Sequence, residues 1–167
     1  MPTIRPPCAS AGAETGTTPR APGRQRYEWL YVYGWVNPES GETFWLLLPT
    51  VNKVMMNVAL KAFAEHLGLS ATRRVALVWD NAGWHRGLEL PEGLDVICLP
   101  AYSPELQPAE RLWELVDEPI ANRMVADMET LKDILCRRCV TLMNELGDLV
   151  RGRTLFYWWP RLYKVTN

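Results

Sequence analysis

The chain has 167 residues, of which 48% are hydrophobic, and eight of them are tryptophans. This composition provides enough apolar material for the core of one ordinary domain. The formal net charge of −1 excludes a globally basic protein, so any contact with nucleic acid requires a local patch of arginines and lysines. No apolar stretch approaches the roughly 20 residues of a membrane-spanning helix, so no membrane partner is expected.

The first 26 residues are predicted to be a disordered tail. They contain five prolines and three glycines but almost no large apolar side chains. Such a segment cannot bury enough surface to offset the entropy lost on ordering. It also lacks the apolar region of a secretory leader, so we expect a protein of the reducing cytoplasm.

The next segment shows a hairpin signal followed by a helix signal. Residues 27–36 and 42–49 are aromatic and β-branched runs separated by a turn sequence, which predicts a β-hairpin. Residues 52–68 are predicted to form a helix that stops at Gly68. Its apolar residues near helical spacing are Val54, Val58, Phe63 and Leu67.

Two short apolar runs and two helical segments follow. The runs VALVWD and DVICLP are typical of buried central strands. Residues 109–124 predict a helix interrupted by Pro119, and a long amphipathic helix is expected from Met128 to Gly147. The aromatic, basic C-terminus is expected to pack back on the core. This order predicts an α/β layer with a mixed sheet and no phosphate-binding loop.

The pair Cys136 and Cys139 has the spacing of metal ligands or of a redox pair. The two cysteines lie inside a helical pattern, and no second pair or histidine cluster accompanies them. We therefore favour the interpretation that they are small helix residues one turn apart.

Two acids are candidates for a functional site. Asp80 ends a predicted strand, where ligands and metals gather in α/β sheets, although such an aspartate is also a common turn former. Glu110 is predicted in the first turn of a helix after Pro108, a position that the helix dipole alone favours. The two side chains can converge on one sheet edge, and their hard oxygens suit Mg²⁺ or Mn²⁺. His85 could orient a phosphate or a metal-bound water, or it could cap the following turn.

The segments DNAGWH (residues 80–85) and LPAYSPELQPAERLW (residues 99–113), with a strand between them, resemble the core of mariner-like insertion-sequence transposases, which are DDE superfamily endonucleases. The resemblance implies a ribonuclease H-like mixed sheet flanked by helices over residues 27–160, with a C-terminal tail at 161–167. It also implies that Asp80 and Glu110 are metal-binding catalytic acids, supported by Asn81 and His85. Gln107 replaces the asparagine that is usual in this family.

The resemblance further implies a reaction and its partners. Two Mg²⁺ or Mn²⁺ ions, on the order of 4 Å apart, would activate the nucleophile and stabilise the leaving oxygen while transposon ends are cut and joined to target DNA. The expected partners are DNA and further copies of the chain. A local basic face for DNA would come from arginines that, taken singly, are more often solvated surface: Arg73, Arg74, Arg86, Arg111 and Arg123.

One family feature is missing. The first catalytic aspartate of the family lies on a strand before the hairpin, but no aspartate precedes Asp80 in this chain. The upstream acids, none of which occupies such a strand position, are Glu14, Glu28, Glu39, Glu42 and Glu65. We therefore expect a truncated copy whose sheet lacks its first strand, and whose exposed strand edge invites self-association. The alternatives are an active nuclease, a non-catalytic DNA-binding or oligomerisation remnant, and a structural domain with no nucleic-acid role.

Overall fold

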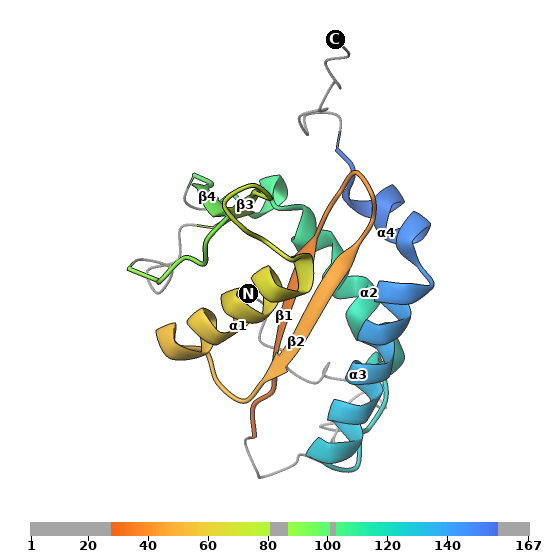
Figure 1. The fold of residues 1–167 in the computed structure, drawn as a ribbon. Coiled ribbons are helices and arrows are strands. Elements are labelled where there is room, and N and C mark those ends of the chain that lie inside the picture. Colours follow the sequence, from red (N-terminus) through yellow and green to blue (C-terminus); the bar gives the residue numbers. More distant parts are fainter. Residues whose placement is uncertain (1–27, 81–86, 101–102, 157–167) are drawn as a thin grey trace, which may run out of the picture.

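The fold is that of a computed structural model, which describes residues 28–80, 87–100 and 103–156 (Figure 1). The tails predicted at residues 1–26 and 161–167 lie outside these ranges. Helices and small sheets alternate as the sequence predicts, and the fold is a mixed α/β arrangement. Within the described ranges, every helix is too short or too polar to cross a membrane.

A β-hairpin lies at the centre of the molecule (Figure 1). Its strands, β1 (Tyr31–Val36) and β2 (Thr43–Leu48), pair antiparallel, which confirms the predicted hairpin. In the turn, the Asn37 carbonyl accepts a hydrogen bond from the Gly41 N–H at 2.8 Å, and its side chain accepts one from the Glu39 N–H at 3.0 Å. Asparagine favours such turns because its side chain bonds the backbone two residues on.

Both faces of the hairpin are buried, each under a different part of the chain. On one face Trp35 stacks on Phe63 of α1 (Lys53–Leu67), with ring centroids 5.2 Å apart. On the other face Val32 and Trp45 join a cluster formed with the C-terminal helices. Because successive strand residues point to opposite faces, the alternating apolar side chains of the hairpin supply both clusters.

Helix α1 has the predicted ends but a different buried face. The Asn52 side chain caps its N-terminus by accepting from the Met55 N–H at 2.8 Å, and Gly68 ends it in the left-handed region with φ 62°. Val54 and Val58 are 66% and 51% exposed. Phe63 of the predicted set is buried, and Leu67 packs against the same cluster. The buried residues of the helix are Met56, Ala59, Leu60, Phe63 and Ala64.

The strands β3 (Val75–Trp79) and β4 (Leu94–Cys98) form a second, parallel sheet. Among the described residues, β1 pairs only with β2 and β3 only with β4, so the mixed sheet that we expected is divided into two. The prediction that β3 and β4 are buried central strands is wrong for most of their length, since in β4 Asp95, Ile97 and Cys98 are exposed. Trp79 is buried but Ala76 is exposed, because α1 covers only one face of this sheet.

The rest of the chain covers the second face of the hairpin. It forms η2 (Pro104–Leu106), η3 (Pro108–Leu112), α2 (Trp113–Asp117), η4 (Glu118–Ile120), α3 (Met128–Asn144) and α4 (Gly147–Thr154). The long helix predicted from Met128 to Gly147 therefore ends early, and α4 is a separate helix. Arg138 of α3 donates to the Leu115 carbonyl at 2.6 Å and pairs with Glu118, which fastens α3 to the preceding segment.

The two cysteines of α3 occupy helical positions, as we favoured. Cys139 is 3% exposed and belongs to the core, and Cys136 is partly buried. Burial, with a smaller contribution from Cys136, raises the pKa of the Cys139 thiol to about 12. A thiol with such a pKa is protonated at neutral pH, which disfavours both redox and metal chemistry.

We predict that Leu135→Ala destabilises the protein by about 2–5 kcal/mol, because this side chain of α3 is fully buried and its loss leaves a cavity. The control on the same helix is Val140→Ala, which should change stability by less than about 1 kcal/mol because Val140 is 53% exposed. Urea unfolding of both variants measures the difference. Equal losses would contradict the packing of α3 on the hairpin.

We also predict that iodoacetamide at neutral pH labels Cys98, which is exposed, and leaves Cys139 unmodified in the native protein. Unfolding in denaturant should make both thiols reactive. Mass spectrometry of the labelled peptides reads out each cysteine separately. Native labelling of Cys139 at the rate of Cys98 would show that α3 does not bury it.

Candidate functional site

Asp80 stands directly after β3, at the carboxyl end of the parallel sheet. It follows the buried Trp79, whose indole N–H lies 3.3 Å from the Cys98 sulfur of β4. The Leu99 N–H donates to the Trp79 carbonyl at 2.9 Å, so the chain that leaves β4 passes beside the residue before Asp80. Asp80 itself is half-buried. The structure thus confirms the predicted place of this acid at a strand end.

Glu110 lies in the first turn of η3, as the sequence predicts, although the turn is a 3₁₀ helix. Its N–H donates to the Gln107 carbonyl at 3.1 Å, and the buried Pro108 begins the helix. Proline at this position fixes the backbone without the loss of a helical hydrogen bond. The Glu110 side chain is half-buried and borders a pocket.

This pocket has a volume of about 370 Å³, and both acidic and basic side chains line it. Among the described residues it is lined by Pro104, Glu105, Glu110, Arg111, Glu114 and Arg153, and Asp80 is not one of them. Sequence reasoning did not single out Glu105 or Glu114. Glu114 could have been found, because it lies one helical turn after Glu110.

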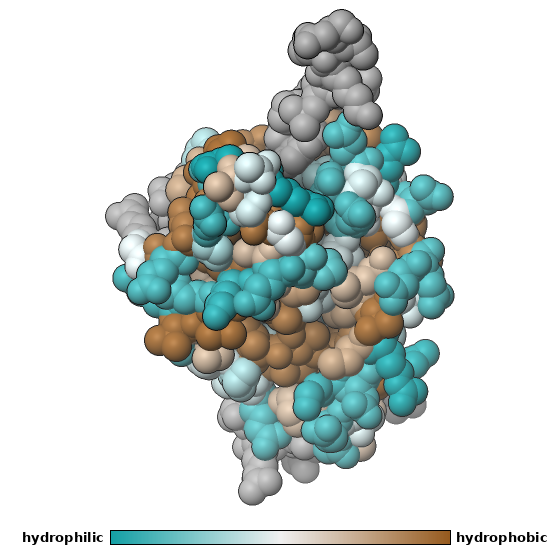
Figure 2. Space-filling view, in the orientation of Figure 1, coloured by the Kyte–Doolittle hydropathy of each residue, from teal (hydrophilic) through white to brown (hydrophobic). Residues whose placement is uncertain are grey.

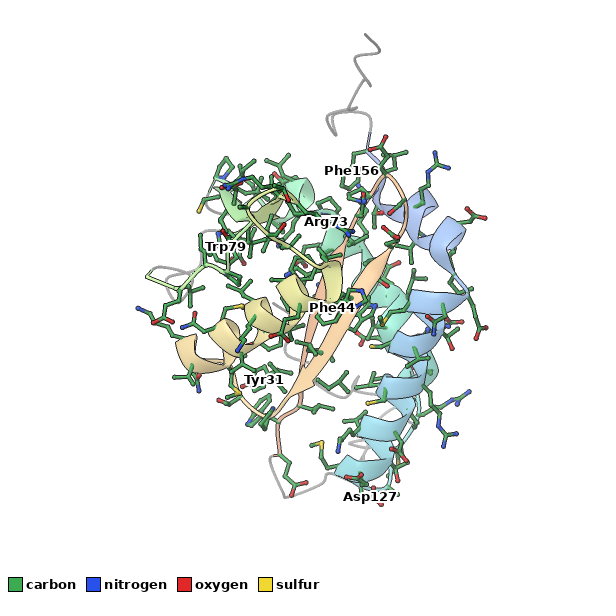
Figure 3. All side chains as sticks on the ribbon, viewed as in Figure 1. Tyr31, Phe44, Arg73, Trp79, Asp127 and Phe156 are labelled. Atoms are coloured by element: carbon green, nitrogen blue, oxygen red, sulfur yellow. The ribbon has the colours of Figure 1, made fainter. Side chains whose placement is uncertain are left out.

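The C-terminal helix holds the segment that carries Glu110. Helix α4 packs on η3, and Arg153 pairs with Glu114 at 3.4 Å. The Arg111 guanidinium lies over the Phe156 ring, 4.2 Å from its centroid. In Figure 3, Phe156 lies above the hairpin turn, whereas Trp79, the neighbour of Asp80, lies to the left of the hairpin. The two acids are therefore supported by different parts of the core.

The side chains of Asp80 and Glu110 are of the type that binds a hard divalent cation, but among the described residues too few such side chains lie together. Carboxylate oxygens are the ligands that Mg²⁺ and Mn²⁺ prefer. Within the three described ranges, however, no group of three acidic, histidine or cysteine side chains could hold a metal ion. The structure places Asp80 after β3 and Glu110 in η3, as expected, and in the described part of the chain neither acid belongs to a group of three such side chains.

The remaining predicted site residues are only partly described. Asn81, His85 and Arg86 lie outside the described residues. Arg74 makes a forked ion pair with Asp95 of β4, with its shortest contact at 2.6 Å.

The other arginines are spread over different parts of the chain. Arg73 and Arg123 are exposed, and Arg111 is held by Phe156. Figure 2 shows hydrophilic side chains in several groups on this face rather than in one.

Comparisons with known proteins place the chain in a family. A family model described as "DDE superfamily endonuclease" matches residues 4–132. The matched range begins before the end of the predicted tail and stops before Pro160. An uncharacterized protein of Sinorhizobium fredii, y4pE/y4sA, is 31% identical over 123 residues, which are 72% of this chain and 87% of that protein.

A solved structure supports the fold. The chain matches one from the crystal structure of the Mos1 strand transfer complex with a TM-score of 0.52 and 18% identity, over 88% of this chain. It spans 50% of the length of that solved chain. At this identity the match shows the ribonuclease H-like fold and not the activity. Taken together with the motifs around Asp80 and Glu110, the family match shows that the chain belongs to the DDE superfamily endonucleases.

Proposed function

We propose that this chain is a DDE-type transposase domain, of the kind that carries out metal-dependent cleavage and strand transfer of DNA, in a copy without the family's first catalytic aspartate, and that Asp80 and Glu110 are its remaining metal-binding acids. Membership of the DDE endonuclease family supports the reaction class. The matched structure is titled a strand transfer complex, which favours DNA and further copies of the chain as partners.

The observation that carries the proposal is the arrangement of the two acids along the fold. Asp80 directly follows β3, and the hydrogen bond from Leu99 to Trp79 brings the chain that leads to Glu110 past the same strand end. From there η2 and η3, each begun by a proline, give the chain a stiff course up to Glu110. Two acids that converge on a strand end would suit a cation-binding site.

Asp80 and Glu110 would hold the Mg²⁺ or Mn²⁺ ion of such a site. A bound ion of this kind polarises a phosphate and lowers the pKa of water, which is the chemistry that phosphodiester cleavage needs. If the two acids of the described residues are not joined by a third, the chain should bind an ion weakly, and most of the two-metal catalysis should be lost.

A second function is favoured by the missing third acid among the described residues. The chain would then bind DNA or other copies without cutting, as a non-catalytic remnant of the same fold. Its DNA binding should depend on salt and should persist in Asp80→Ala and Glu110→Ala. Filter binding at two salt concentrations measures both properties.

We predict that Asp80→Asn and Glu110→Gln each weaken Mn²⁺ binding by about tenfold or more, because even residues that only orient metal ligands contribute roughly 10–100-fold. Isothermal titration calorimetry of the whole chain measures the affinity. The matched control is Glu114→Gln, since Glu114 lines the pocket of Glu110 but pairs with Arg153. Equal losses in all three variants, or none in the first two, would contradict the assignment.

A cleavage assay separates the two functions. With Mg²⁺ and duplexes that carry the ends of the encoding element, we expect the chain alone to cut little or no DNA. Efficient cutting that disappears in Asp80→Ala and Glu110→Ala would show a complete nuclease and overturn the incomplete-site version. Salt-dependent binding without cutting, unchanged in both variants, would favour the non-catalytic function.

A further inference from the structure

Two arginines border the pocket beside Glu110, and each comes from a different element. Arg111 belongs to η3, and its guanidinium lies over the Phe156 ring, 4.2 Å from the centroid. Arg153 belongs to the last turn of α4. A guanidinium presents a rigid fork of N–H donors that matches the oxygens of a phosphate or a carboxylate. Two such groups at one pocket therefore favour an anionic ligand.

Helix α4 is fixed to the core, so the backbone of Arg153 has a defined place. Val150 and Thr154 are fully buried, and the Thr154 hydroxyl donates to the Val150 carbonyl at 2.9 Å. At the start of the helix, Gly41 of the hairpin turn lies so close that a Cβ on it would overlap the Gly147 carbonyl. Arg153 directly precedes Thr154, yet its side chain is half-exposed. The helix thus presents a mobile guanidinium on a rigid support.

The ion pair of Arg153 with Glu114 is loose. Its N···O distance is 3.4 Å, whereas charged N–H···O hydrogen bonds usually measure about 2.7–2.9 Å. The two side chains are 50% and 81% exposed, and exposed pairs contribute little to stability. Arg138, by contrast, is 17% exposed and holds both Glu118 and the Leu115 carbonyl. Arg153 can therefore exchange its partner at small cost.

The Glu114 carboxylate occupies the donors of Arg153 that an entering phosphate needs, because arginine binds both anions through the same N–H groups. The exposed side chains of this pair border the pocket, so a polymer can continue past it. Three carboxylates and two guanidinium groups line the pocket, so its net charge does not attract an anion. The directed N–H donors of the two arginines must therefore supply the binding.

We propose that Arg111 and Arg153 bind a backbone phosphate of DNA at this pocket, and that Glu114 restrains the binding by competing for Arg153. The assignment rests on the proposed function, which makes DNA the ligand, and it adds the residues that hold the strand beside Glu110. A phosphate contact positions the duplex and carries no sequence information. A short duplex of arbitrary sequence therefore serves as the probe.

The test measures the affinity of the whole chain for a fluorescent duplex by anisotropy, without divalent cations and at several salt concentrations. Arg153→Gln and Arg111→Gln should each weaken binding by about tenfold near 0.1 M salt, and each should lower the slope of log Kd against log salt by about one. The control is Arg137→Gln, which removes the same charge from an exposed position of α3 outside the pocket. It should change the affinity by less than about twofold, because exposed distant charges are screened by salt.

Two acids of the pocket provide a matched pair for the competition. Glu114→Gln should tighten DNA binding by about two- to fivefold, because it releases Arg153 from an exposed ion pair. The same change should have no effect when combined with Arg153→Gln. Glu105→Gln removes an equal charge from the same pocket, but in the described part of the chain Arg153 pairs with Glu114 and not with Glu105. Its effect should therefore be the same with and without Arg153.

The outcomes separate this phosphate site from the proposed function. If the natural chain does not bind the duplex, both fail. If it binds and Arg153→Gln changes neither the affinity nor the salt slope, only the phosphate site fails. Equal gains from Glu114→Gln with and without Arg153 would show general charge repulsion and overturn the competition. Circular dichroism checks the folding of each variant, and if Arg153→Gln does not fold, Arg153→Lys decides, because it should keep the salt slope while it loses the fork of donors.

Discussion

The burial of the hairpin on both faces is the constraint on which the rest of the structure depends. Trp35 stacks in one cluster and Trp45 in the other, and each large aromatic ring removes about 150–250 Å² from water. Gly34 is part of the same constraint, because a Cβ there would lie 2.3 Å from the Trp45 ring. The hairpin therefore needs both α1 and the C-terminal helices to be in place.

This arrangement also assigns the two candidate acids to two supports. Asp80 follows β3, which packs with α1 on one side of the hairpin. Glu110 lies on η3, whose Leu112 is fully buried on the other side, and α4 braces that segment. The hairpin is thus the common frame between the acids. A core substitution on either side of the hairpin would therefore shift one acid relative to the other, although neither acid is itself changed.

Local signals carried the part of the fold that could be predicted from the sequence. The hairpin turn, the Gly68 stop of α1 and the first-turn position of Glu110 all depend on residues close in the chain. Other features depend on segments that are distant in the chain. They are the exposure of Val58, the cation–π contact of Arg111 with Phe156, and the ion pair of Glu114 with Arg153. The two-sheet division likewise depends on which strands find partners, and periodicity does not contain that information.

We propose above that Asp80 and Glu110 serve one cation site, although the elements that carry them pack against opposite faces of the hairpin. Paramagnetic broadening by Mn²⁺ in NMR spectra of the whole chain tests it most directly, because the effect falls steeply with distance from the ion. We expect the amides next to both acids to broaden together, at the same Mn²⁺ concentration. Broadening next to one acid alone, or at two different concentrations, would contradict a shared site.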